Sequence, residues 1–81
     1  MTNRIITMFN QNKPNLTVTG VYKLTNSEYI VEAVETTVEK NYNDPFYKVD
    51  LTTGAVTNYL PTLELDKFIE AVEKRTIYKR R

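Results

Sequence analysis

The sequence predicts an α+β fold, an antiparallel β meander of four or five strands with one C-terminal α-helix packed on one face. Two observations carry this prediction. Alternating, β-branched segments separated by turn residues run through residues 16–60. A single amphipathic stretch with helical spacing follows over residues 62–75. With 81 residues, the chain is expected to form one domain, 1–81, with a small core.

Residues 1–15 are expected to form an N-terminal strand and a polar loop. Ile5, Ile6, Met8 and Phe9 group apolar side chains in a short run that suits a strand at about Arg4–Phe9. The loop follows because the sequence NQNKPN, which contains Pro14, disfavours regular structure.

The first strand of the meander is predicted over LTVTGVYKL, residues 16–24. Leu16, Val18, Gly20, Tyr22 and Leu24 fall on one side of an extended chain, and polar residues dominate the other. Glycine weakens a strand interior, so Gly20 indicates a bulge or the close approach of another backbone.

Residues 28–40 (EYIVEAVETTVEK) fit either a helix or a strand. Their glutamates recur at helical spacing, and Thr25 with Glu28 matches a helix capping box. Against this, six of the ten residues 29–38 are β-branched, and residues 25–27 suit a tight turn between strands. We adopt the strand, and the helix remains the alternative.

A β-hairpin is predicted over residues 46–59. If Asp50 pairs with Ala55, residues 51–54 form the loop, and Gly54 supplies a left-handed conformation. Val49 then faces Val56 across the ladder, and cross-strand pairs of this kind stabilise a sheet by about 0.2–1 kcal/mol each.

The helix is predicted over residues 62–75, where Thr62 can cap the first turn. Its apolar stripe consists of Leu65, Phe68, Ile69 and Val72, which should pack on the sheet. Residues 76–81 form a basic tail, either a short terminal strand or a loose end.

Charge is divided unevenly along the chain. Residues 1–73 hold six basic and ten acidic side chains, a net of −4, whereas residues 74–81 hold five basic ones and no acid, a net of +5. This basic end is the candidate contact site for nucleic acid or a protein partner. Its candidate residues are Lys74, Arg75, Tyr78, Lys79, Arg80 and Arg81.

The composition argues against an enzyme. The chain has no histidine and no cysteine, which excludes imidazole acid–base chemistry and thiol catalysis. Two glycines cannot build a phosphate-binding loop. Carboxylate pairs such as Asp44 with Asp50, or Glu32 with Glu35, arise readily among ten acids, and Asp50 is better explained as a turn residue. We therefore expect no catalytic residues, no metal site and no cofactor.

One stretch resembles a known group of proteins. The run DPFYKVD (residues 44–50), then Thr53 and Gly54, then a helix with Phe68 and Ala71, resembles small uncharacterised proteins encoded by bacteriophages and integrated elements of Gram-positive bacteria. The run VYKLTNSEYIVEA (residues 21–33) is similar to their paired strands. The resemblance implies a phage-linked origin and no site residues. It places the chain in the host bacterial cytoplasm, or in the virion if the protein is structural.

The expected function is therefore a non-enzymatic one that works through protein–protein contacts. Small domains without disulfides or metals gain stability by association, so a homo-oligomer is expected, through edge strands at Arg4–Phe9 or Ala55–Tyr59. The partner would be a phage structural protein or a host protein, which leaves open a minor virion or assembly component and a host-directed factor. No apolar run approaches the length of roughly 20 residues that spans a bilayer, so no membrane role is expected.

The alternative function is nucleic-acid binding. The basic tail would contact phosphates, and Tyr22, Tyr29, Tyr47 and Tyr59 would offer stacking platforms on the sheet. The acidic body and a pI near 7.9 weigh against this alternative.

Overall fold

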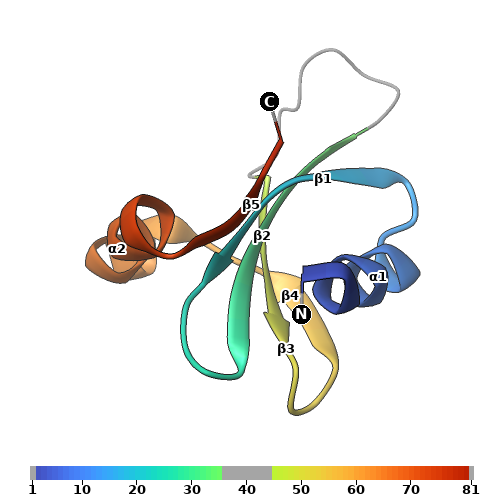
Figure 1. The fold of residues 1–81 in the computed structure, drawn as a ribbon, viewed down its shortest axis with the longest axis horizontal. Helices are drawn as coiled ribbons and strands as arrows, with labels where there is room; N and C mark the ends of the chain where they lie inside the picture. The colour runs from blue at the N-terminus through green and yellow to red at the C-terminus, as the bar shows by residue number, and fades with distance from the viewer. Residues whose placement is uncertain (1, 36–44, 81) are drawn as a thin grey trace.

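The computed structural model describes residues 2–35 and 45–80. Five antiparallel strands form one sheet in the order β4-β3-β2-β1-β5, with a helix on each side (Figure 1). The α+β fold is confirmed, and a second helix is added to it. In chain order the elements are α1 (Thr2–Asn12), β1 (Leu16–Lys23), β2 (Glu28–Glu35), β3 (Phe46–Asp50), β4 (Ala55–Asn58), the 3-10 turn η1 (Pro61–Glu64), α2 (Leu65–Lys74) and β5 (Thr76–Lys79).

The two faces of the sheet carry separate cores, because successive side chains of a strand point to opposite faces. Helix α1 closes the larger core, and α2 closes the smaller one. The buried residues of the α1 core are Ile5, Phe9, Val18, Val21, Tyr29, Val31, Ala33 and Val49. Those of the α2 core are Tyr22, Ile30, Tyr59 and Ala71.

The N-terminal strand prediction is wrong, because residues 2–12 form helix α1. Ile5 and Phe9 are four residues apart, so a helix places both on one face, and both are fully buried against the sheet. The helix also runs into the predicted loop. It ends at Asn12, just before Pro14, and the Asn12 side-chain amide donates to the Met8 carbonyl at 3.1 Å.

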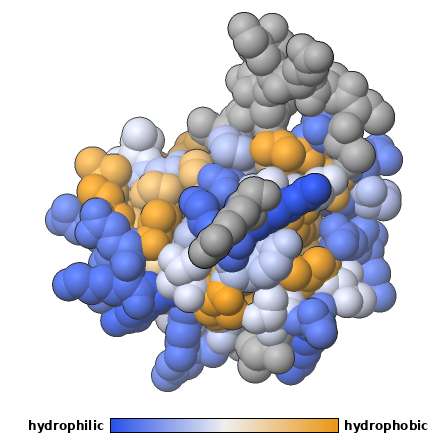
Figure 2. Space-filling view, turned by 45° about the horizontal axis from the view of Figure 1, so that its top comes forward, coloured by the Kyte–Doolittle hydropathy of each residue, from blue (hydrophilic) through white to orange (hydrophobic). Residues whose placement is uncertain are grey.

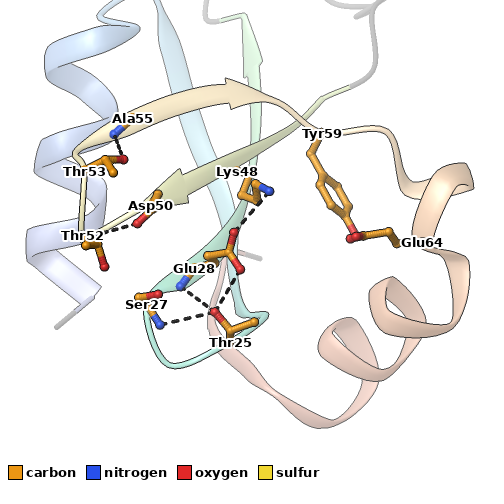
Figure 3. A network of polar contacts seen from close by, with 10 residues as sticks. All are labelled: Thr25, Ser27, Glu28, Lys48, Asp50, Thr52, Thr53, Ala55, Tyr59 and Glu64. Atoms are coloured by element: carbon orange, nitrogen blue, oxygen red, sulfur yellow. Dashed lines mark hydrogen bonds and ion pairs between the residues drawn. The ribbon is translucent and has the colours of Figure 1, made fainter.

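The strand prediction for residues 28–40 is confirmed over Glu28–Glu35, and residues 36–40 lie outside the described part of the chain. Glu28 and Thr25 make one of the two bonds of a capping box, since the Glu28 N–H donates to Thr25 Oγ1 at 3.1 Å. The Glu28 carboxylate accepts from the Thr25 hydroxyl at 3.2 Å, and the Thr25 N–H donates to the Glu28 carbonyl instead. Here the motif closes the tight turn between β1 and β2 (Figure 3). The same side-chain chemistry serves a turn as well as a helix start.

Gly20 marks a bulge, as predicted, but its close neighbour is a side chain and not another backbone. The register between β1 and β2 shifts between Val18 and Gly20, so a bulge is present. A Cβ atom at Gly20 would meet the Tyr22 hydroxyl at 2.6 Å, so the ring of Tyr22 lies where a side chain would otherwise be.

The hairpin is confirmed in its register. Asp50 pairs with Ala55 and Val49 with Val56, and Gly54 has a φ of 75° in the loop. Asp50 acts as the expected turn residue, since its Oδ1 accepts from the Thr52 N–H at 2.8 Å.

Between β4 and β5 the chain crosses a whole face of the sheet, because these strands lie at opposite edges. The helix in this crossing begins later than predicted. Pro61–Glu64 form the 3-10 turn η1, Glu64 is the N-cap of α2, and no side-chain hydrogen bond caps either element, so Thr62 does not act as a cap. Residues 76–79 form strand β5. Of the two alternatives for the basic tail, a short terminal strand and a loose end, the strand is therefore the correct one.

Candidate interaction surface

The basic end is part of the fold, and two of its charges, Arg75 and Lys79, are already engaged with other side chains. Arg75 forms an ion pair with Glu70 at 2.9 Å, and its backbone carbonyl accepts from the Lys23 N–H. Lys74 is exposed at the last turn of α2, where its charge suits the helix dipole. Arg81 lies outside the described residues.

Strand β5 positions the remaining candidates on different sides of the sheet. Tyr78 is half-buried and packs against the α1 core. Lys79 points to the other face, where its Nζ donates to the Tyr22 hydroxyl at 3.2 Å and lies 5.7 Å from the ring centroid. This hydrogen bond raises the pKa of Lys79. Arg80 is exposed, and its backbone N–H donates to the Thr19 carbonyl. The candidates are adjacent in sequence without forming one basic patch.

The sheet tyrosines do not form an open stacking platform. Tyr22, Tyr29 and Tyr59 are 1%, 4% and 6% exposed, because a helix covers each face of the sheet. Tyr47 is half-buried and packs against Phe9, with ring centroids 5.2 Å apart. Base stacking needs an exposed ring face, and these rings are used in the cores.

A cleft of about 320 Å³ lies between α2 and the β1–β2 turn. Its charged side chains are mostly paired with one another: Lys48 with Glu28 at 3.2 Å, and Arg75 with Glu70. Figure 3 shows the Glu28 side of this network. Paired opposite charges leave little net charge to attract an ionic ligand.

The described residues offer little else for chemistry. Among residues 2–35 and 45–80, no group of three acidic side chains converges as a metal site would require. Glu32 and Glu35 are three residues apart on β2, so their carboxylates point to opposite faces of the sheet. Asp44 lies outside the described residues. No described helix is long and apolar enough to cross a membrane.

The feature that the sequence pattern did not reveal is a group of exposed large apolar side chains on η1, on α2 and at Leu60 just before η1. Four of them, which we call the leucine surface, are Leu60 (47% exposed), Leu63 (77%), Leu65 (52%) and Ile69 (41%). In Figure 2 hydrophobic residues gather at the left of the view, over α2. Leu65 and Ile69 were predicted to pack on the sheet, and that part of the prediction is wrong.

Helix geometry explains why these side chains stay exposed. The apolar residues of α2 span an arc wider than its contact with the sheet. Ala71 lies at the contact, with Phe68 and Val72 half-buried beside it, and Leu65 and Ile69 fall on one flank beyond. Phe68 packs against Phe46 with ring centroids 4.9 Å apart, which orients the helix.

The start of the crossing is held to the sheet by Tyr59. Its ring is buried, and its hydroxyl donates to Glu64 Oε2 at 3.2 Å (Figure 3). Burial, and then the negative charge and hydrogen bond of Glu64, raise the pKa of Tyr59 to about 12. This contact fixes η1 and therefore the position of Leu60 and Leu63.

Comparison of the chain with protein-family models, with curated protein sequences and with solved structures found no match.

Proposed function

We propose that this chain is a non-enzymatic protein of a bacteriophage or mobile element that works through protein–protein contacts, and that its leucine surface binds a second copy of the chain. The exposure of Leu60, Leu63, Leu65 and Ile69 is the observation that carries the proposal. Exposed large apolar side chains gathered in one stretch of chain, here residues 60–69, are typical of association surfaces.

The size of the surface favours a second copy as the occupant. The four exposures add to about two fully exposed large side chains, whose complete burial would contribute roughly 3–6 kcal/mol. A symmetric dimer uses the surface of both chains and so doubles this contribution, to about 6–12 kcal/mol. Association costs about 4–15 kcal/mol, so a pair of these surfaces is large enough to offset it.

Light scattering at tens of micromolar tests the proposal. The wild type should report at least twice the chain mass of 9.5 kDa. Leu63→Asp should return the mass to that of a single chain, because a carboxylate at the most exposed apolar position cannot be buried without cost. Asn10→Asp makes the same charge change on the exposed side of α1 and should leave the oligomer intact.

A wild type that remains monomeric at these concentrations would overturn the self-association. Nucleic-acid binding would be favoured instead if labelled single-stranded DNA or RNA bound at low salt and the binding weakened with rising salt. That binding should then be lost on replacing Lys79 and Arg80, the cations of the β5 edge, by alanine.

The proposal leaves two roles to separate, a virion or assembly component and a host-directed factor. The genes on either side of the coding sequence separate them. Neighbouring genes for head and tail proteins favour the particle role, whereas early-region neighbours favour action on a host protein.

A further inference from the structure

The two edges of the sheet differ in how they are protected from pairing with another chain. Edge strands present unpaired N–H and C=O groups, which proteins shield with charges, bulges or short strands. Strand β5 carries Lys79, is followed by Arg80, and has a register shift against β1. Strand β4 has the sequence AVTN, with no charge and no register shift against β3.

The uncharged character extends beyond β4. Residues 51–63 (LTTGAVTNYLPTL) contain no charged side chain, although 26% of the chain is charged. This segment includes the β4 edge and also Leu60 and Leu63 of the leucine surface. The edge and the exposed leucines therefore form one uncharged run of chain.

The register of the hairpin shows which backbone groups of β4 are free. The Tyr59 N–H donates to the Phe46 carbonyl at 3.0 Å, so Tyr59 faces β3. Residues alternate in an antiparallel ladder, so Thr57 also faces β3, and Val56 and Asn58 point their N–H and C=O groups outward. Within the described part of the chain, β4 pairs with β3 alone.

From these observations we infer that two copies of the chain join through antiparallel pairing of β4 with β4, with the two-fold axis at Thr57. In this register each Val56 faces Asn58 of the second copy, and four hydrogen bonds satisfy every outward group of both strands. A register centred on Val56 or on Asn58 satisfies only part of them. The two five-stranded sheets become one sheet of ten strands.

The same register gives Leu60, which continues the extended chain beyond β4, a place in the contact. Leu60 falls opposite Gly54 of the second copy, which has no side chain to exclude it. An antiparallel β5–β5 contact over Thr76–Lys79 would instead place Arg80 of each chain opposite Arg75 of the other, and opposed like charges destabilise a strand pair.

The inference rests on the proposed self-association and specifies its geometry. The chain has no cysteine, so single cysteine variants report the contact directly. At a non-hydrogen-bonded antiparallel pair the two Cα atoms are about 4.5 Å apart, a separation that a disulfide can bridge. Thr57→Cys should therefore form a disulfide dimer under mild oxidation.

Thr53→Cys is the matched control, an exposed threonine in the same hairpin that the register places far from its symmetry mate. We expect cross-linking at Thr57→Cys to be about tenfold faster or more, because the paired strands raise the local thiol concentration. In the wild-type protein, the amides of Val56 and Asn58 should exchange hydrogen more slowly as the protein concentration rises.

The possible results separate the inference from the proposed function. A dimer by light scattering whose two cysteine variants cross-link equally slowly, with unprotected Val56 and Asn58 amides, would overturn β4 pairing and leave self-association standing. A monomer at every concentration would overturn both. Fast cross-linking at Thr57→Cys together with amide protection is the result the inference requires.

Discussion

The two helices differ in how much of their apolar surface the sheet uses. Helix α1 buries Ile5 and Phe9 completely, whereas Ala71 is the buried residue of α2, and Leu65 and Ile69 remain exposed on that helix. Both helices are amphipathic, so amphipathicity alone does not report how deeply a helix packs. The difference indicates that α1 is used fully in the core of the single chain, whereas part of the apolar surface of α2 stays exposed.

The largest effect should come from the α1 side. Phe9→Ala removes a fully buried ring that contacts Tyr47 and should lower the unfolding free energy by about 3–5 kcal/mol. The stability of a small domain is about 5–15 kcal/mol, so this variant should lose a large fraction of its stability. Urea unfolding followed by circular dichroism measures the effect; a loss below about 1 kcal/mol would mean that α1 does not pack as described.

An intermediate effect is expected on the α2 side. Phe68 is half-buried between Phe46 and Tyr59, so Phe68→Ala should cost about 1–3 kcal/mol, less than Phe9→Ala. The same denaturation experiment ranks the two variants. If Phe68→Ala cost as much as Phe9→Ala, the two helices would be equally important to the single chain, and the comparison would fail.

Alkaline pH should weaken the attachment of η1. Because the pKa of Tyr59 is raised from 10.0 to about 12, the folded state holds this proton more tightly than the unfolded state. The stability from this group is therefore intact below pH 10 and is lost as the pH rises towards 12. Melting temperatures of the wild type should fall more steeply over this range than those of Tyr59→Phe, which cannot ionise. If the melting temperatures of the two proteins fell in parallel, the attribution of this pH dependence to Tyr59 would be contradicted.

The smallest effect on the single chain should come from the leucine surface. Leu63 is 77% exposed, so Leu63→Ala should change the unfolding free energy by less than about 0.5 kcal/mol at concentrations where the protein is monomeric. A larger loss in dilute solution would show that Leu63 packs within its own chain.

Local signals predicted much of the fold. The hairpin register followed from Asp50 and Gly54, since turn chemistry and cross-strand pairing specify the same alignment. The strand over 28–35 followed from β-branched residues, despite the capping-box pattern of Thr25 and Glu28. In both regions the residue types themselves favour one local structure over the others.

Two parts of the fold depended on tertiary contacts that local patterns do not report. Residues 2–12 contain isoleucines that suit a strand, and the need to cover the sheet opposite α2 favours a helix that buries Ile5 and Phe9 together. Tail residues 76–79 became a strand because β1 had a free edge to pair with. For these segments, burial and pairing decided the structure.

The candidate site was predicted only in part. The charge asymmetry singled out residues 74–81 as a candidate, but it did not predict that Arg75 and Lys79 would be engaged with Glu70 and Tyr22. The exposure of Leu65 and Ile69 could not be read from the sequence, because a stripe at helical spacing looks the same whether the sheet or a partner covers it. The sequence did hold one signal of an exposed apolar surface, because Leu60 and Leu63 lie outside the predicted stripe.

The most direct test of the comparison is a dilution series followed by methyl NMR of the wild-type protein. The leucine and isoleucine methyl signals of Leu63, Leu65 and Ile69 should shift as the protein is diluted, and those of Ile5 in α1 should stay in place. Such a result would show that the side chains of η1 and α2 lose contact with a second chain when the protein is diluted. Shifts confined to Ile5, or an unchanged spectrum at every concentration, would contradict the account.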